Sequence, residues 1–137
     1  MTNQPKSLSQ LSNSNQTKPE ISSETLARKI AEAADERKAE DIVLLNVAEL
    51  SYLADYFVIV TGFSKAQLKA ISDSIEKKIA EDVQVYPLRT SGKVEASWII
   101  HDYGDVIVHI FLPQEREFYN LEAFWGHARR SEFQSHQ

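Results

Sequence analysis

Two nearly unbroken hydrophobic runs constrain the fold of this 137-residue chain most strongly. They cover residues 41–47 and 56–61, are rich in β-branched residues and are bounded by polar residues. A strand with one face in water alternates hydrophobic and polar residues, whereas continuous runs are typical of strands that are covered on both faces. We therefore expect both segments to be central strands of a sheet with other elements packed on each side.

Helices are predicted next to these strands. Ser22 and Ser23 are N-cap candidates for a first helix that ends near Lys38. Ser64 and Gln67 form a possible capping box at the start of a second helix. This second helix has one hydrophobic stripe, formed by Leu68, Ile71, Ile75 and Ile79.

The second half of the chain predicts three more strands and a last helix. Residues 83–86 can form a short strand, and residues 97–101 and 106–111 flank a turn-like segment, which predicts a β-hairpin. The last helix follows Pro113 and is marked by hydrophobic residues at helical spacing, namely Phe118, Leu121 and Trp125. Together these elements predict a single α/β domain with about five strands.

Both ends of the chain are predicted to lie outside this domain. Residues 1–22 are almost entirely polar and can bury too little hydrophobic surface to offset the entropy of ordering, so we expect a disordered tail. The domain is expected over residues 23–128 and a flexible end over 129–137. The start of the chain shows no secretory signal or transit peptide, and no hydrophobic run approaches the roughly 20 residues that span a bilayer, so we expect a soluble cytoplasmic protein.

The charge of the domain favours a basic protein as partner. The chain has a net charge of −5, and residues 1–22 carry +1, so the remaining residues carry −6. An acidic domain is repelled by a phosphate backbone, which makes direct nucleic-acid binding a poor expectation. The chain contains no cysteine, which excludes a disulfide framework, a thiolate metal site and a thiol nucleophile.

A metal or acid/base site can be considered at the predicted hairpin. Asp102 and Asp105 bracket the turn beside His101 and His109, and carboxylates with imidazoles can bind a metal or transfer protons. Asp and Gly are also favoured in turns for conformational reasons alone, and this interpretation is preferred. Gly62 stands alone between a strand and a helix, so neither a phosphate-binding loop nor a dinucleotide fingerprint is present, and no serine lies in a nucleophile elbow.

The pairing of the predicted hairpin separates the two histidines. If residues 102–105 form the loop, antiparallel pairing sets His101 against Val106 and Trp98 against His109. Side chains alternate between the faces of a sheet, so the two histidines then lie on opposite faces. We therefore expect no metal ion shared between them.

Four aromatic residues of the hairpin and the last helix are candidates for a protein interface: Trp98, Tyr103, Tyr119 and Trp125. A core position is an equal alternative for Trp98 and the preferred one for Trp125.

Long motifs in this chain resemble the ribosome-silencing factor family, also called the Iojap family. They are ADYFVIVTG at residues 54–62, WIIHDYGDVIVHIF at residues 98–111 and EREFYNLE at residues 115–122, and the resemblance extends over roughly residues 24–126. It implies a mixed five-stranded sheet flanked by helices, similar to nucleotidyltransferases but without their catalytic Gly-Ser and paired metal-binding carboxylates. It also implies a protein that is not an enzyme and needs no cofactor or metal.

The resemblance further implies a partner and a binding site. Members of the family bind the fourteenth protein of the large ribosomal subunit, a basic protein, and block the joining of the two subunits. The residues to which binding is attributed match Trp98, Tyr103 and Tyr119, which we expect to share one surface. Two alternatives remain: a metal-dependent nucleotidyltransferase-like enzyme that uses Asp102 or Asp105, and a homodimerisation module that pairs through an exposed edge of the hairpin.

Overall fold

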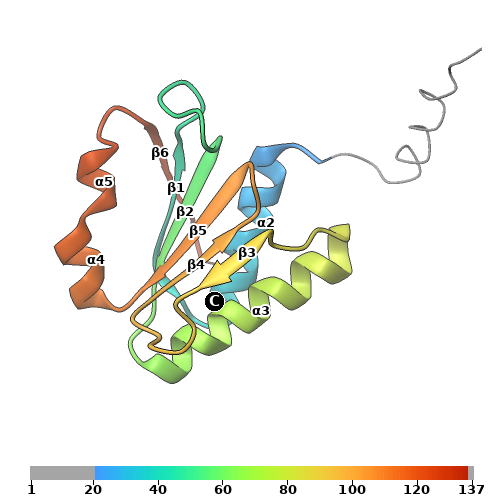
Figure 1. Cartoon of the computed structure of the whole chain (residues 1–137), viewed down its shortest axis with the longest axis vertical. Helices are drawn as coiled ribbons and strands as arrows, with labels where there is room; N and C mark the ends of the chain where they lie inside the picture. Colours follow the sequence, from blue (N-terminus) through green and yellow to red (C-terminus); the bar gives the residue numbers. More distant parts are fainter. Residues whose placement is uncertain (1–20, 136–137) are drawn as a thin grey trace, which may run out of the picture.

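The computed structural model describes residues 21–135, which form a mixed sheet of six strands flanked by helices (Figure 1). The strands are β1 Glu40–Asn46, β2 Tyr56–Thr61, β3 Arg89–Ser91, β4 Trp98–Asp102, β5 Val106–Phe111 and β6 Arg129–Glu132. The helices are α2 Ser23–Asp35, α3 Lys65–Val83, α4 Pro113–Tyr119 and α5 Leu121–Phe124. The strand order is β3-β4-β5-β2-β1-β6, in which β2 and β5 are parallel and the other neighbours are antiparallel. The predicted α/β class is confirmed, with six strands instead of five.

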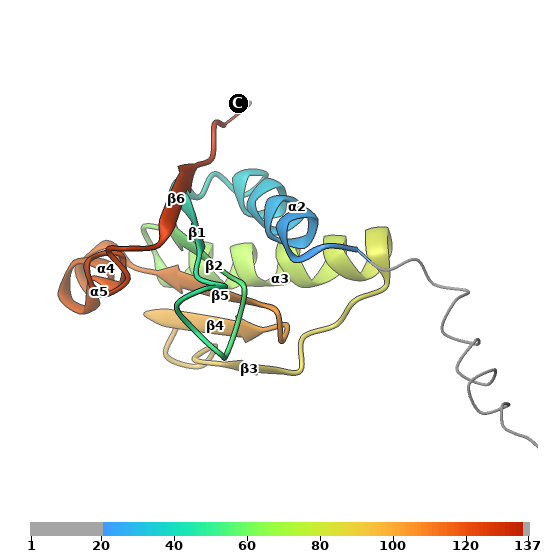
Figure 2. The ribbon, with the colours of Figure 1, turned by 90° about the horizontal axis from the view of Figure 1, so that it is seen from above.

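The sheet separates two hydrophobic clusters. Seen from above, α2 and α3 lie on one side of the sheet, and α4 with α5 lies on the other (Figure 2). Neighbouring residues of the central strands point into different clusters: Leu44 and Val58 face the helices α2 and α3, whereas Leu45 and Ile59 belong to the second cluster. The prediction that β1 and β2 are central strands covered on two faces is therefore confirmed.

The predicted helix starts are confirmed at both long helices. The Ser64 hydroxyl accepts a hydrogen bond from the Gln67 backbone N–H at 3.0 Å, which satisfies a donor at the first turn of α3. The Gln67 side chain accepts from the Phe63 N–H at 2.7 Å and donates to the carbonyls of Arg37 and Lys38. This single side chain thereby joins the start of α3 to the turn after α2.

The first helix is slightly shorter than predicted. Ser22 is its N-cap, as expected, and accepts from the Thr25 N–H at 3.1 Å. The helix ends at Asp35 rather than near Lys38, because Lys38 has a positive φ of 62°. Most of the expected disordered tail, residues 1–20, lies outside the described residues.

The prediction of a strand at residues 83–86 is wrong. Helix α3 continues to Val83, and Gln84 then adopts a left-handed conformation with φ 54° that ends it. The third strand forms later, at β3, and pairs with β4. Because β3 pairs with residues 100–102 of β4, this part of the hairpin is not the free edge that the dimer alternative assumed.

The hairpin is confirmed, but its pairing differs from the expected one by two residues. His101 lies opposite Val108 instead of Val106, and Trp98 lies opposite Phe111 instead of His109. The cause is the length of β4, which continues through Asp102 and shortens the loop. A shift of two residues preserves the alternation of side chains, so His101 and His109 still lie on opposite faces, as predicted.

The C-terminal region differs in two ways from the prediction. The last helix is broken at Asn120, whose φ of 43° separates α4 from α5. The end expected to be flexible over 129–137 contains β6, which pairs antiparallel with β1, for example Asn46 with Arg129. Residues 136–137 lie outside the described residues, and within 21–135 no helix is long and apolar enough to cross a membrane.

Candidate partner-binding surface

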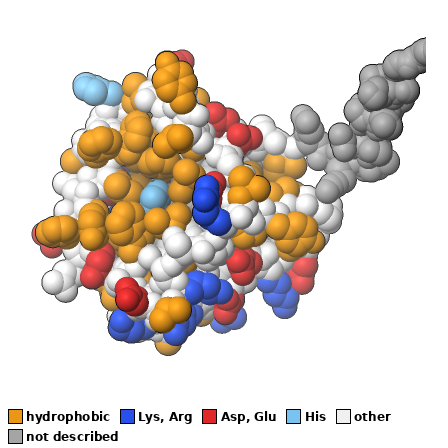
Figure 3. Space-filling model, viewed as in Figure 1, with side chains coloured by type: hydrophobic (Ala, Val, Ile, Leu, Met, Phe, Trp, Pro, Cys, Tyr) orange, Lys and Arg blue, Asp and Glu red, His pale blue; other side chains and the backbone are white. Residues whose placement is uncertain are grey.

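The sheet face opposite α2 and α3 is only partly covered. Helices α4 and α5 lie over it but bury none of their own residues fully. The second cluster on this face consists of Val43, Leu45, Val47, Ala54, Phe57, Ile59 and Phe111. Half-buried residues continue it to the surface, where hydrophobic side chains gather over α4, α5 and the neighbouring strands (Figure 3). A partly open hydrophobic face of this kind is typical of protein interfaces.

Trp98 and Tyr119 lie together on this face. Trp98 is the first residue of β4 and is half-buried, while Tyr119 is the last residue of α4 and is 47% exposed. Their ring centroids are 4.5 Å apart, and the indole also stacks on the buried ring of Phe111 at 4.9 Å. The two predicted anchors therefore form one aromatic surface that is supported from below by the core.

His109 lies beneath Trp98 and is almost fully buried. The Trp98 indole N–H donates a hydrogen bond to Nδ1 of His109 at 3.1 Å. The Phe57 ring and the imidazole form a T-shaped pair, with the ring centroids 5.1 Å apart. Burial lowers the pKa of His109 from 6.5 to about 4, so this histidine is neutral at pH 7. The sequence suggested His109 as a candidate for metal or acid/base chemistry, whereas the structure shows it as a hydrogen-bond partner of Trp98.

Tyr103 does not share this surface, and the expectation that the three aromatic residues lie together is wrong for it. It is only 7% exposed and belongs to the cluster under α2 and α3. Its ring lies 6.2 Å from that of His101, which also faces α3. Burial raises the pKa of the Tyr103 hydroxyl, so it stays protonated. The structure therefore brings Trp98 and Tyr119 together and separates Tyr103 from them.

Arg116 attaches α4 and α5 to the sheet. Its guanidinium donates to the Asp41 carbonyl at 2.6 Å and to the Thr61 hydroxyl at 2.8 Å. It also forms a salt bridge with Glu122 across the break between the helices, and the two side chains are only 12% and 15% exposed. The motif EREFYNLE contains both charged partners, but the sequence shows no signal for the contact with β1, because Asp41 and Arg116 are 75 residues apart.

The charge of α4 and α5 is negative. Residues 113–124 contain three glutamates and one arginine, and that arginine is already paired with Glu122. Glu115 and Glu117 form no salt bridge within residues 21–135, so the helix α4, which carries Tyr119, is acidic. An acidic element of this kind attracts a basic partner and steers its approach.

Asp102 and His101, two of the residues considered for metal or acid/base chemistry, have structural roles. One oxygen of Asp102 accepts from the Gly104 N–H at 2.8 Å, and the other lies 3.5 Å from Nε of Arg89. This confirms the interpretation of Asp102 as a turn residue. His101 shares a hydrogen bond of 2.7 Å with Ser72 of α3, on the opposite side of the sheet from His109.

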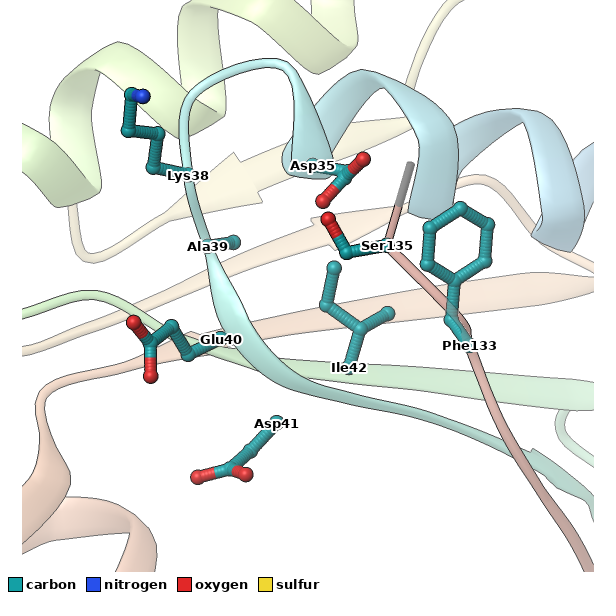
Figure 4. A pocket seen from close by; sticks show the side chains of 8 residues that line it. All are labelled: Asp35, Lys38, Ala39, Glu40, Asp41, Ile42, Phe133 and Ser135. Carbon is teal, nitrogen blue, oxygen red and sulfur yellow. The ribbon is translucent and has the colours of Figure 1, made fainter. Parts of the chain in front are cut away.

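A pocket of about 400 Å³ lies elsewhere, between the start of β1 and the C-terminal residues (Figure 4). It is lined by Asp35, Lys38, Ala39, Glu40, Asp41, Ile42, Phe133 and Ser135. The described part of the chain contains no group of three or more His, Cys, Asp or Glu residues that could hold a metal ion. None of the predicted partner-binding residues lines this pocket.

Comparison with known proteins identifies the family. The family model described as "Ribosomal silencing factor during starvation" matches residues 20–137. The chain belongs to this family. The resemblance noted in the motifs around the hairpin and α4 is therefore confirmed.

Individual relatives in the ribosomal silencing factor family agree with this assignment. Ribosomal silencing factor RsfS of Halalkalibacterium halodurans is 40% identical over 108 residues, which cover 79% of this chain and 92% of that protein. Protein Iojap, chloroplastic, of Zea mays is 46% identical over 104 residues, which cover 76% of this chain and 45% of that protein. A crystal structure of a protein from Chromobacterium violaceum superimposes with a TM-score of 0.75 at 30% identity, and the match covers 85% of this chain and 98% of that one.

Proposed function

We propose that this ribosomal silencing factor binds the large ribosomal subunit and prevents it from joining the small subunit. The observation that carries the proposal is the aromatic surface of Trp98 and Tyr119 on a partly open sheet face, in a chain of this family. The proposed partner is the fourteenth protein of the large subunit, and the site of action is the cytoplasm.

The proposed mechanism needs no bond making. Trp98 and Tyr119 lose water against the ribosomal protein, and aromatic residues of this kind often supply most of the binding energy of an interface. Glu115 and Glu117 on α4, the helix that carries Tyr119, favour a basic partner. The body of the domain then occupies space that the small subunit needs. The protein acts in this proposal as a steric block and not as an enzyme.

Tyr103 has an indirect part in this proposal. A residue that is 7% exposed and faces α3 cannot contact a partner on the opposite sheet face without a rearrangement. Its ring supports the hairpin that carries Trp98 at its other end. Replacing Tyr103 by Ala should therefore lower the stability of the fold more than the affinity for the subunit.

The test is co-sedimentation of the purified protein with separated large and small subunits. We expect recovery with large subunits only, and inhibition of subunit joining when the protein is added before mixing. Trp98→Ala and Tyr119→Ala should each weaken binding by about 2–4 kcal/mol while the fold is kept, which a thermal melt measures. Tyr86→Ala is the control, because Tyr86 is also an exposed tyrosine, 65% against 47% for Tyr119, but lies in the segment after α3.

The outcomes separate this proposal from its alternatives. Equal recovery with both subunits, or with neither, contradicts it. A second copy of the chain could also cover the open sheet face, and sedimentation equilibrium of the free protein measures this dimer. If Trp98→Ala breaks a dimer and leaves subunit binding unchanged, the surface is a homodimer interface.

A further inference from the structure

His109 has an unusual position for a buried histidine. It is 7% exposed, and its ring lies among the aromatic side chains of this face, stacked near Phe111 at 6.1 Å and in a T-shaped contact with Phe57. One ring nitrogen, Nδ1, contacts the Trp98 indole N–H, and the other, Nε2, has no hydrogen-bond partner within residues 21–135. Hydrophobic packing alone does not require an imidazole here.

The hydrogen bond determines the proton position on this histidine. An indole nitrogen can only donate, so Nδ1 of His109 must accept and the ring proton must lie on Nε2. The ring must also be neutral, since a protonated imidazole carries hydrogen on both nitrogens. Burial keeps the imidazole neutral, because it lowers the pKa of His109 to about 4.

The same bond determines what Trp98 can offer to a partner. Its single polar group, the indole N–H, is already satisfied by His109 on the inner side of the surface. The rest of the side chain is carbon, and its rings are fixed by Phe111 at 4.9 Å and Tyr119 at 4.5 Å. A partner group that needs a hydrogen-bond donor would find none at this position.

We propose that His109 is a positioning residue for the partner-binding surface: it holds the indole N–H of Trp98, so that Trp98 presents only carbon atoms to a hydrophobic patch of the partner. This inference rests on the proposed function, because the partner is the one that Trp98 and Tyr119 bind. It adds that the ribosomal protein is hydrophobic opposite Trp98, while its basic residues lie nearer to Glu115 and Glu117.

A first experiment tests the hydrogen bond in the free protein. Long-range ¹H–¹⁵N NMR spectra distinguish the two neutral tautomers of histidine, and we expect His109 with its proton on Nε2 at pH 7. The indole N–H of Trp98, assigned with the help of Trp125→Phe, should exchange slowly with solvent. A proton on Nδ1, or fast exchange of the indole N–H, would overturn the proposal whether or not the protein binds ribosomes.

A second experiment tests positioning through affinity for the large subunit. His109→Phe keeps an aromatic ring but removes the acceptor, and we expect binding to weaken about tenfold, the effect of one hydrogen bond. The matched control is His101→Phe, the same change at a buried histidine on the other face, which bonds to Ser72. This control should lower the melting temperature without changing affinity.

A double-mutant cycle separates positioning from simple packing. In the Trp98→Phe background the indole N–H is gone, so adding His109→Phe should change affinity by less than about twofold. Independent, additive losses would mean that His109 acts by packing and would overturn the proposal. If the wild-type protein fails to bind large subunits, the proposed function fails, and the NMR experiment still decides whether His109 holds Trp98.

Discussion

Replacement of Arg116 by Ala should release α4 and α5 from the sheet while the rest of the fold remains. The two helices bury none of their residues fully, so their position depends strongly on this side chain. Arg116 donates to a carbonyl of β1, to the Thr61 hydroxyl and to Glu122. Tyr119 is carried by α4, so the aromatic surface should be lost together with the attachment.

The expected loss of free energy in Arg116→Ala follows from these contacts. Each hydrogen bond to a charged group contributes about 1.5 kcal/mol or more, and removing one partner of a poorly exposed ion pair leaves the other uncompensated. The side chains of Arg116 and Glu122 are 12% and 15% exposed, so water can replace only a small part of their interaction. We expect the free energy that holds residues 113–124 on the sheet to fall by about 3 kcal/mol. Arg116→Lys keeps the charge without the planar fork and should give an intermediate loss.

Hydrogen exchange measured by mass spectrometry is the appropriate assay, because it reports local opening in residues 113–124 separately from global unfolding. These amides should exchange roughly 100-fold faster in Arg116→Ala, and binding to large subunits should weaken in parallel. The control is Arg28→Ala, whose ion pair with Glu24 on α2 is 52% and 56% exposed and should contribute little. Unchanged exchange of residues 113–124 in Arg116→Ala would refute the assignment of this arginine as the attachment point.

Two further predictions concern stability. Burial lowers the folded-state pKa of His101 and His109 to about 4, so between pH 6.5 and pH 4 the unfolded chain binds protons that the folded chain does not. As the pH is lowered through this range, the free energy of unfolding should therefore fall by about 1.4 kcal/mol per pH unit for each histidine. Urea denaturation at several pH values measures this dependence of the unfolding free energy on pH. In His109→Phe its slope should be smaller by the contribution of one histidine, and an unchanged slope would contradict the prediction. Gly92→Ala should destabilise by more than about 2 kcal/mol, because Gly92 has a φ of 86° and an added Cβ would lie 2.0 Å from the Trp98 carbonyl oxygen. Gly104→Ala is the control, since its φ of 89° is similar but the nearest atom is a side-chain carbon at 3.5 Å; equal losses at both glycines would show that the contact with Trp98 does not matter.

The sequence alone was sufficient for features that depend on neighbouring residues. The hydrophobic runs of β1 and β2, the stripe along α3 and the cap at Ser64 are short-range patterns, and the structure confirms each of them. The opposite orientation of His101 and His109 was also predictable, because the alternation of a strand holds even when the pairing shifts by two residues.

The sequence was misleading where a local pattern competed with tertiary contacts. Residues 83–86 alternate like a strand, yet α3 continues to Val83 because its hydrophobic stripe packs on the sheet. All four residues of β6 are exposed and show no hydrophobic pattern, but the strand forms because the edge of β1 offers unpaired backbone groups.

By itself, the sequence therefore determined the α/β class and the acidic charge, and it named the aromatic residues that are candidates for partner binding. Only the tertiary structure decided which of them share a surface: it joins Trp98 to Tyr119, turns Tyr103 into the opposite cluster and places His109 beneath the indole. The physical reason is distance along the chain. A hydrogen bond such as that between Arg116 and the Asp41 carbonyl leaves no periodic signal, because its partners meet only when the sheet closes.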